Sequence, residues 1–409
     1  MVDNKNKQPE LNIGLVGHID HGKTTLLYQL TGVWSDKHSE ELKRGITIKL
    51  GYADSLIRKC EKCGKFTTKP VCECGGKVSE IRYVSFVDAP GHEMLMATML
   101  GGAAIIDAAL LVIAANEPFP QPQTKEHLLA LEAKGISQVI IVQNKLDLIT
   151  KEEAKKQYDA VKKFIKGTIA ENATIIPICA QQGINIGALL EAVTKLKIPE
   201  HDTISKPLFL IARSFDVNKP GTKPKDLSGG ILGGSLKKGK LKIGDIIEIK
   251  PGLAKKKHDK TEYYAIKTKI TGLRAGVNKL SEALPSGSLA IQTSLDPLLA
   301  KADSLAGCVA GLEGTLPELA YKIKIKINLF KEIVGAKAKE AIKIEQLKTN
   351  ENLLLSVNTT TTVGLITSIH NNTTEIALKI PIVSFPGDRI GIARNYQGHW
   401  RLIGWGEIQ

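Results

Sequence analysis

The chain has no uninterrupted apolar run long enough to cross a membrane as a helix, which takes about 18 to 20 residues. Its opening segment, MVDNKNKQPE, is polar and lacks the apolar core of a secretory signal. Cysteine is scarce, with six among 409 residues, and four of the six fall between positions 60 and 74. Such a cluster is typical of a metal site and not of a secreted disulfide framework. We therefore expect a cytoplasmic protein with no membrane partner.

Acidic residues are fewer than basic residues: the chain has 42 Asp and Glu and 56 Lys and Arg, which gives a formal net charge of +14. An excess of this kind favours association with a polyanion such as RNA, through the release of counterions. A basic protein without a nucleic-acid partner fits the charge about as well. The composition, 43% hydrophobic and 24% charged, is that of an ordinary globular chain, and the length allows two to three domains.

Apolar runs alternate with amphipathic stretches over the first half of the chain. The expected strands are Asn12–Val16, Arg82–Val87, Ala108–Ala114, Gln138–Val142 and Thr174–Ile178. The expected helices are Lys23–Thr31, Glu93–Gly101, Thr124–Lys134, Lys151–Lys166 and Ile184–Thr194. Strands and helices that alternate in this way indicate an α/β domain with a parallel sheet covered on both faces.

The pattern changes after a charged, proline-containing linker at Lys195–Pro207. The stretch GGILGGSLKKGKLKIGDIIEIKPG alternates short apolar runs with glycine turns, which predicts the hairpins of a small β-barrel. Along Tyr321–Leu329, Lys alternates with Ile, so we expect the charges to face solvent and the isoleucines to face a second β-rich core. We expect an α/β domain at 1–203 with a cysteine-rich insert at 59–77, then all-β barrel domains at 204–319 and 320–409.

The segment Gly17–Thr24, GHIDHGKT, follows an expected strand and opens an expected helix, which is the context in which G-x-x-x-x-G-K-[ST] binds phosphate. Its glycines let backbone N–H groups surround phosphate oxygens, and the helix start adds a favourable dipole. Lys23 would reach the β- and γ-phosphates, and the Thr24 hydroxyl would coordinate Mg²⁺. A chance match in a glycine-containing turn is the alternative, and the flanking strand and helix disfavour it.

Two further segments extend this site. Asp88 ends an apolar run in Asp88-Ala89-Pro90-Gly91, where its carboxylate can hold Mg²⁺, directly or through water, and the Gly91 N–H can meet the γ-phosphate. Thr47, in RGITI, can bind Mg²⁺ only when the γ-phosphate is present, so its loop would order with GTP and relax after hydrolysis. Taken by itself, each segment fits a simpler interpretation: Asp88–Gly91 fits an ordinary turn, and RGITI fits a short edge strand equally well.

The tetrapeptide Asn144-Lys145-Leu146-Asp147 follows another expected strand. The Asp147 carboxylate can accept hydrogen bonds from the ring N–H and the exocyclic amine of guanine, whereas adenine presents the opposite pattern there. Such tetrapeptides are common at strand-to-helix turns, so the choice of guanine depends on the elements that precede it. Taken together, these elements predict that the chain binds GTP.

With GHIDHGKTT, RGITI, DAPGH and NKLD in this order, the first half of the chain resembles the GTPase domain of the translational GTPases. The resemblance implies that His92 positions the attacking water, and that Asp20 and Lys23 also belong to the catalytic group. It implies that magnesium is held by Thr24, Thr47, Asp20 and Asp88. It implies that GTP or GDP is contacted by Asp20, His21, Gly22, Lys23, Thr24, Thr25, Thr47, Asp88, Gly91, Asn144, Lys145, Asp147, Cys179, Ala180 and Gln181.

Cys179 departs from the pattern of that family. Translational GTPases usually have Ser at the first of the three positions Cys179-Ala180-Gln181, which the resemblance places at the carbonyl of guanine. The departure puts a side-chain role for Cys179 in doubt, while a backbone contact would survive it.

Three longer stretches are similar to the gamma subunit of the archaeal and eukaryotic translation initiation factor 2. They are WSDKHSEELKRGITIKLGYA, AANEPFPQPQTKEH and ARSFDVNKPGT, and the resemblance extends from Leu11 to Gln409. It implies three domains, a heterotrimer with alpha and beta subunits, and GTP-dependent delivery of methionyl initiator tRNA to the small ribosomal subunit. Hydrolysis of GTP to GDP would then be the release switch, slow without the ribosomal complex.

The insert carries two cysteine pairs, Cys60-Glu-Lys-Cys63 and Cys72-Glu-Cys74, each followed by glycine. Four thiolates complete a closed tetrahedral Zn²⁺ site, with Gly64 and Gly75 relieving the tight backbone, so such a metal would be structural. In many gamma subunits the second cysteine pair looks like C-x-x-C, whereas in this chain it is the shorter C-x-C. Reduced cysteines in a loop without metal are the alternative.

Two other functions stay open at this point. An elongation factor that carries aminoacyl-tRNA, general or selenocysteine-specific, belongs to the same superfamily, although the insert and FDVNKPGT argue against it. A regulatory or scaffolding protein could bind the nucleotide without hydrolysis, but it would need neither His92 nor Thr47. Lysine runs such as Lys255–Lys257 are more often solvated faces than RNA contacts, so no tRNA contact is assigned to them.

Overall fold

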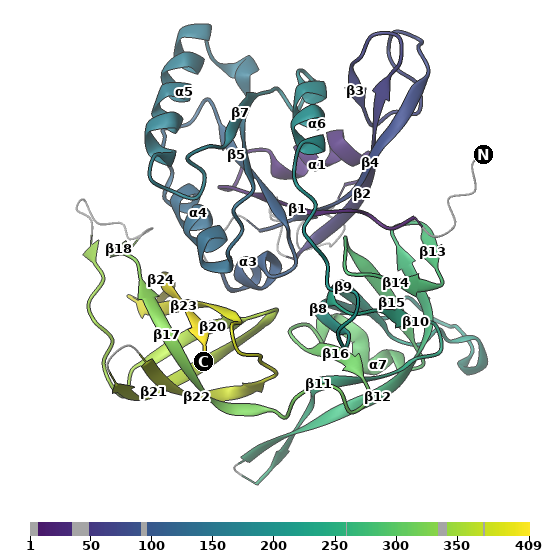
Figure 1. Ribbon diagram of the computed structural model, residues 1–409, viewed down its shortest axis with the longest axis vertical. Helices are drawn as coiled ribbons and strands as arrows, with labels where there is room; N and C mark the ends of the chain where they lie inside the picture. The colour runs from purple at the N-terminus through teal and green to yellow at the C-terminus, as the bar shows by residue number, and fades with distance from the viewer. Residues whose placement is uncertain (1–6, 35–48, 91–95, 259, 334–341, 371–372) are drawn as a thin grey trace. The chain divides into compact units, whose positions relative to one another are not determined.

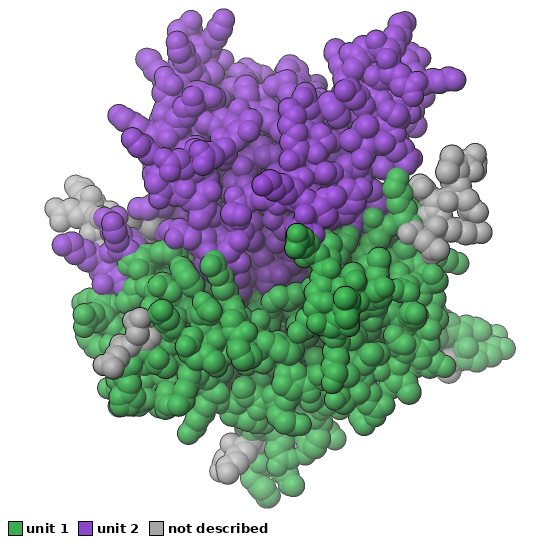
Figure 2. Space-filling model, viewed as in Figure 1, with its two compact units in different colours: residues 1–8, 200–330, 345–409 green, residues 9–199, 331–344 purple. Residues whose placement is uncertain are grey.

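The computed structural model of the chain describes residues 7–34, 49–90, 96–258, 260–333, 342–370 and 373–409. The chain divides into two compact units (Figure 2). The α/β unit comprises residues 9–199 and 331–344, and the β unit comprises residues 1–8, 200–330 and 345–409. Among the described residues, no helix has the length and apolar character that a membrane span requires.

The α/β unit is built on one seven-stranded sheet with the strand order β3-β2-β4-β1-β5-β6-β7 (Figure 1). Its strands are β1 (Asn12–Val16), β2 (Gly51–Cys60), β3 (Phe66–Thr67), β4 (Val78–Asp88), β5 (Ala108–Ala114), β6 (Val139–Asn144) and β7 (Thr174–Pro177). Strands β4, β1, β5, β6 and β7 are parallel neighbours in that order. Their carboxyl ends therefore meet at one edge of the sheet, where loops with functional side chains can converge.

Helices connect these strands. They are α1 (Lys23–Thr31), α3 (Met96–Ala103), α4 (Pro122–Lys134), α5 (Lys151–Ile165) and α6 (Ile186–Thr194), together with the short η2 (Leu146–Leu148). Leucines of α1 and α6 share one apolar core with the strands, while α3 packs against α4 and α4 packs against β5. Every residue of β1 and of β5 is buried, as expected of central strands with apolar side chains on both faces.

The expectation of an all-parallel sheet is wrong at one edge. Strand β2 pairs with β4 in antiparallel fashion over Gly51–Cys60, and β3 pairs antiparallel with β2. The reason is the cysteine-rich insert, because it turns the chain back on itself between β2 and β4. Parallel neighbours would need a crossover connection in its place.

The first barrel lies in the β unit. Six of its strands form a ring in the order β11-β16-β8-β9-β15-β12, and β12 pairs with β11 to close it. They are β8 (Leu208–Phe215), β9 (Ile231–Lys238), β11 (Ile246–Lys257), β12 (Lys260–Ala275), β15 (Leu289–Thr293) and β16 (Val309–Leu312). Smaller elements decorate the ring: η3 (Pro224–Asp226), β10 (Leu241–Lys242), β13 (Asn278–Leu280), β14 (Glu282–Ala283), α7 (Pro297–Ala300) and η4 (Lys301–Asp303).

The second barrel is closed by six strands in the order β17-β22-β21-β20-β23-β24. They are β17 (Ala320–Leu329), β20 (Asn352–Val357), β21 (Thr360–His370), β22 (Thr373–Ile382), β23 (Arg389–Tyr396) and β24 (His399–Ile408). The alternation in β17 is confirmed, since Ile323 and Ile325 are buried while the lysines between and beside them are exposed. The antiparallel pair of β18 (Glu332–Ile333) and β19 (Ile342–Lys343) belongs to the α/β unit. The expected class, an α/β domain followed by two barrels, is confirmed.

Candidate nucleotide site and cysteine cluster

The segment Gly17–Thr24 runs from the end of β1 into the first turn of α1, at the carboxyl edge of the sheet. Gly17 and Gly22 have φ values of 138° and 89°. A Cβ on Gly17 would lie 2.3 Å from the carbonyl oxygen of Val112, and one on Gly22 would lie 2.4 Å from Nδ2 of Asn144. Both positions therefore require glycine, for backbone conformation and for space, and the loop is packed directly against β5 and the end of β6.

The Lys23 side chain is folded over this loop. Its Nζ donates to the carbonyl oxygens of Gly17 at 2.9 Å and His18 at 2.7 Å, and the residue is only 7% exposed. The ammonium charge is thereby held beside the start of α1, where backbone N–H groups without helical partners point outward. A loop of this kind is a cradle for a phosphate group.

Thr24 and Asp88 meet at the first turn of α1. The Thr24 hydroxyl donates to Oδ2 of Asp88 at 2.9 Å, and Asp88 is completely buried at the end of β4. The register of β4 against β1 pairs Asp88 with Leu15, two residues before the phosphate loop begins. A hydroxyl and a carboxylate side by side are the oxygen donors that Mg²⁺ prefers, so this pair fits that ion.

Asn144, at the end of β6, ties three segments together. Its Nδ2 donates to the carbonyl oxygen of His21 in the phosphate loop at 2.9 Å. Its Oδ1 accepts from the backbone N–H of Ala180 after β7, also at 2.9 Å. Asn144 is 3% exposed, so both hydrogen bonds are buried. The segments that the sequence assigned to phosphate and to base are therefore joined by this one side chain.

Asp147 lies in η2 with its side chain exposed, as a carboxylate that receives a base must be. The thiol of buried Cys179 donates to its Oδ1 at 3.0 Å. Burial, then the neighbouring Asp147, raises the pKa of Cys179, which keeps the thiol protonated as a donor. Cys179 thus has a side-chain contact within the site, where the sequence left only a backbone contact for it. Gln181 follows as an exposed residue of the same loop.

Glu117 is a member of the site that the sequence did not predict. Its Oε2 lies 3.3 Å from Nε2 of His21 and its Oε1 lies 3.6 Å from Nζ of Lys145. The Nδ1 of His21 lies 2.9 Å from the carbonyl oxygen of Val112. Burial lowers the pKa of His21 to about 4, although the Val112 and Glu117 oxygens both raise it. Glu117 lies in the AANEPFPQPQTKEH stretch. That stretch resembles the family, but nothing in it distinguishes Glu117 as a residue of the site.

The other expected site residues are placed as follows. Asp20 is exposed in the phosphate loop with φ of 60°, and Thr25 is half-buried in the first turn of α1. Thr47, Gly91 and His92 lie outside the described residues. The structure therefore brings together the phosphate loop, Asp88, the Asn144–Asp147 segment and the Cys179–Gln181 segment at one edge of the sheet.

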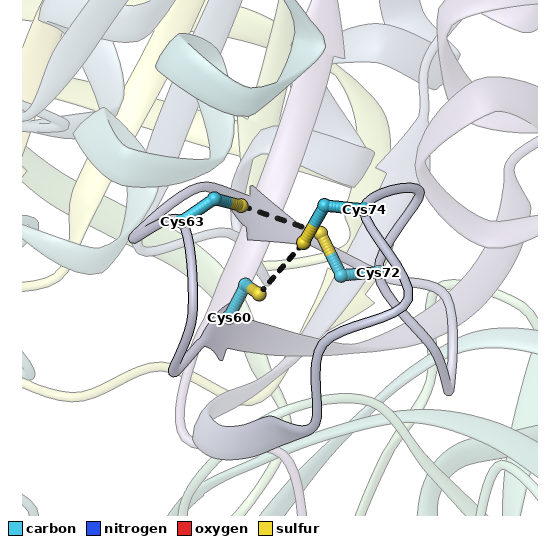
Figure 3. Close-up of side chains that lie close together, drawn as sticks. All are labelled: Cys60, Cys63, Cys72 and Cys74. Carbon is cyan, nitrogen blue, oxygen red and sulfur yellow. Dashed lines mark hydrogen bonds between the residues drawn. The ribbon is translucent and has the colours of Figure 1, made fainter.

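A second cluster lies in the insert, where four thiols from two turns converge (Figure 3). Their sulfur atoms all lie within 4.8 Å of one another, and the Cys60–Cys74 and Cys63–Cys72 sulfurs are 3.5 Å apart. Four sulfurs about 2.3 Å from a tetrahedral Zn²⁺ would be about 3.8 Å apart, so the observed spacing fits that ion.

Backbone N–H groups also point at these sulfurs. The N–H of Cys63, chiefly, lowers the pKa of Cys60 to about 6, with further help from Cys74 and Lys62. The Gly76 N–H, which donates to the sulfur of Cys74, lowers the pKa of that thiol, but the neighbouring Cys60, Cys63 and Cys72 thiols and burial raise it to about 12. Donors aimed at sulfur favour thiolates, which are the form that binds metal. The shortened Cys72-Glu-Cys74 pair thus places both of its sulfurs in the cluster.

Two family models match the chain. The Elongation factor Tu GTP binding domain covers residues 8–199, and the Initiation factor eIF2 gamma C-terminal model covers residues 321–408. Together with the seven-stranded sheet, the glycine-bounded phosphate loop and the Asn144–Asp147 turn, the first match defines the class of protein: this chain is a GTP-binding translational GTPase.

Relatives along the whole chain give the particular family. Translation initiation factor 2 subunit gamma of Methanocaldococcus jannaschii is 54% identical over 405 residues, covering 98% of both chains. The same subunit of Pyrococcus horikoshii is 50% identical over 407 residues, covering 99% of this chain and 98% of the relative. The chain belongs to the translation initiation factor 2 subunit gamma family, and its function is that of a GTP-dependent initiation factor.

Solved structures with the same fold include a selenocysteine-specific elongation factor and the translation elongation factor SelB. A bacterial one superposes with a TM-score of 0.75 at 22% identity over 98% of this chain, which spans 58% of that protein. The factor SelB from Methanococcus maripaludis, in complex with the GTP analogue GppNHp, gives 0.71 at 23% identity, covering 99% of this chain and 79% of that one. At this identity the likeness shows the fold alone.

Proposed function

We propose that this protein carries methionyl initiator tRNA to the small ribosomal subunit in its GTP-bound state and releases it after hydrolysis to GDP. The proposal includes assembly with the alpha and beta subunits of the same factor in the cytoplasm. The observation that carries it is the full-length identity of 54% to an initiation factor 2 gamma subunit, joined to an intact phosphate loop and base-binding turn. The net charge of +14 supports an RNA partner.

The nucleotide is proposed to lie along the carboxyl edge of the sheet. Lys23 and the loop N–H groups would bind the β- and γ-phosphates, while Asp147 would read guanine. The proposed contact set is Asp20, His21, Gly22, Lys23, Thr24, Thr25, Thr47, Asp88, Gly91, Asn144, Lys145, Asp147, Cys179, Ala180 and Gln181. Asn144 supports this arrangement because it fixes the distance between the phosphate and base segments through two buried hydrogen bonds.

Hydrolysis is proposed to depend chiefly on positioning and charge. Lys23 and the loop N–H groups would stabilise the charge that develops on the phosphate oxygens, with His92 orienting the attacking water and Asp20 nearby. Thr24, Asp88, Thr47 and Asp20 would hold Mg²⁺, which when bound would neutralise charge on the β- and γ-phosphates. The Thr24–Asp88 contact of 2.9 Å supports the first two as ligands.

The four insert cysteines, Cys60, Cys63, Cys72 and Cys74, are proposed to hold a structural Zn²⁺. The sulfur spacing and the N–H groups aimed at Cys60 support this. Four protein ligands would leave no open position, so no catalytic role is assigned to the metal. Domain limits at 1–203, 204–319 and 320–409 are likewise proposed, and the ends of α6 at Thr194 and of β16 at Leu312 support them.

The test is binding of labelled methionyl initiator tRNA in the presence of GDP or a non-hydrolysable GTP analogue, with and without the alpha subunit. We expect tighter binding in the GTP state and preference over elongator methionyl-tRNA. The Asp147→Ala variant should lose the nucleotide dependence, and Asp159→Ala, on the exposed part of α5, serves as its matched control. Equal affinity in both nucleotide states, or for both tRNAs, would reject the carrier function.

A further inference from the structure

Gly17, the first residue of the phosphate loop, is held at both of its peptide groups. The Gly17 carbonyl oxygen accepts from Lys23 at 2.9 Å, and the Gly17 N–H donates to Nδ1 of His127 at 3.1 Å. His127 comes from α4, which is 110 positions away in the sequence. Gly17 also packs closely against β5, since a Cβ on it would lie 2.3 Å from the carbonyl oxygen of Val112.

His127 is one of three buried polar residues in the first two turns of α4. The side chains of Thr124, Glu126 and His127 are 0%, 1% and 2% exposed. An apolar side chain would pack at position 127 at a lower desolvation penalty, so the histidine there is explained by the hydrogen bond that its Nδ1 accepts. A histidine that merely fills the core would need no acceptor aimed at a loop, whereas Nδ1 of His127 points at the Gly17 N–H.

We propose that His127 is a positioning residue of the phosphate loop: its Nδ1 lone pair fixes the Val16–Gly17 peptide, and through Gly17 it sets the place of the Gly17 carbonyl oxygen to which the Lys23 ammonium donates. The inference rests on the proposed nucleotide site. It assigns to α4 a direct part in holding the loop, beyond packing against β5.

The role requires a neutral imidazole with its proton on Nε2. Burial lowers the pKa of His127 to about 3, and the positive or titratable groups that face it, Lys23, His18 and His21, lower it further. Protonation at Nδ1 would set two N–H groups against each other and add a charge beside Lys23. The acceptor is therefore present throughout the physiological pH range.

Two substitutions separate positioning from packing. The Oδ1 atom of Asn occupies nearly the place of Nδ1 in histidine, whereas the longer Gln brings its oxygen closer to the place of Nε2. His127→Asn should preserve the acceptor for Gly17, and His127→Gln should lose it while staying polar. We expect the affinity for fluorescent GDP to stay within about threefold in His127→Asn and to fall about tenfold in His127→Gln, the effect of one buried hydrogen bond. Melting temperatures of the nucleotide-free variants are measured alongside.

The outcomes are distinct. Equal affinities in the Asn and Gln variants, or losses that follow the melting temperature alone, would overturn the positioning role. A wild-type chain that fails to bind GDP would instead reject the proposed nucleotide site. If His127→Gln does not fold, ¹⁵N spectra of the histidine rings in the wild type decide the matter. The Nε2–H tautomer at neutral pH is expected for His127, and an Nδ1–H tautomer or a titration near pH 6.5 would contradict the proposal.

Discussion

The side-chain amide of Asn144 joins the guanine-side turn to the phosphate loop, because it donates to the backbone carbonyl of His21 across 2.9 Å of buried space. The same side chain accepts from Ala180 at 2.9 Å. Gly22, the next residue of the loop, has no room for a Cβ, which would lie 2.4 Å from the amide nitrogen. The spacing between the phosphate and base segments therefore depends on one asparagine and one glycine.

Removal of this link should weaken nucleotide binding more than it weakens the fold. Asn144→Ala leaves the His21 carbonyl and the Ala180 N–H without their partner, at about 1–3 kcal/mol for each buried group. We expect GDP affinity to fall at least tenfold, measured by displacement of fluorescent GDP. Asn278→Ala, which removes an amide bonded to Lys7 in the β unit, is the control and should bind GDP as the wild type does.

Cys179 should affect guanine binding through its hydrogen bond to Asp147. Cys179→Ser keeps a donor at that place, whereas Cys179→Ala removes it and leaves the carboxylate less restrained. We expect GDP affinity to fall about threefold to tenfold in the Ala variant, since a hydrogen bond to a charged group contributes about 1.5 kcal/mol. The Ser variant should bind within about twofold of the wild type. A loss of the same size in both variants would mean that the sulfur acts by packing and not as a donor.

Local sequence patterns predicted the exact bounds of the two elements that flank the phosphate loop. Strand β1 and helix α1 have the bounds that the sequence indicated, Asn12–Val16 and Lys23–Thr31, because an apolar run and two glycines mark their ends. Strand β2 was not expected, since GYADSLIRKC is a partly polar edge strand whose pairing depends on distant β4. Its place is fixed by tertiary contact and not by local composition.

The contacts of Glu117 could not be found in the same way. His21, Glu117 and Lys145 follow three different strands, and only the order β1-β5-β6 in the sheet brings them to one place. A single sequence carries no signal for that order, so the carboxylate is not distinguishable from any surface acid of a loop. The motifs that were predicted, by contrast, are contiguous and carry their own strand, turn and helix signals.

We expect metal binding by the insert to require glycine at position 76. Its missing Cβ would lie 2.8 Å from the Cys60 sulfur and 3.3 Å from the Cys74 sulfur, so Gly76→Ala should push the two thiols apart. We expect the affinity for Zn²⁺ to fall more than tenfold, the change that about 1.4 kcal/mol of strain produces. Chelator competition measures the affinity, and the absorption spectrum of the Co²⁺-loaded protein reports the sulfur geometry.

Gly75 offers a control for that experiment. Its φ is 73°, and a Cβ added there would have no described atom within 4 Å beyond its chain neighbours, so its need for glycine is conformational alone. Gly75→Asn should keep the metal, because Asn tolerates the left-handed region. Equal Zn²⁺ affinity in the Gly76→Ala and wild-type proteins would show that the sulfurs do not need the space beside Gly76.

The buried histidine on α4 should make the α/β unit less stable in acid. Burial lowers the pKa of His127 from 6.5 to about 3, so the unfolded chain binds the proton first as the pH falls. Stability is therefore lost progressively from pH 6.5 down towards pH 3, by about 1.4 kcal/mol per pH unit. His127→Asn has no such group, so the difference in unfolding free energy between the variant and the wild type should shift by about 2 kcal/mol in favour of the variant between pH 7 and pH 5.

Urea unfolding followed by helical circular dichroism measures this difference, because the longer helices of the described residues all belong to the α/β unit. Other groups of the unit, such as Asp107, whose pKa burial raises to about 6, act equally on both proteins and cancel in the difference. A difference that stays constant with pH would mean that His127 is protonated as readily in the folded protein as in the unfolded chain. Its Nδ1 would then be no dependable acceptor for the Gly17 N–H, and the loop would have to be held by Lys23 and β5 alone.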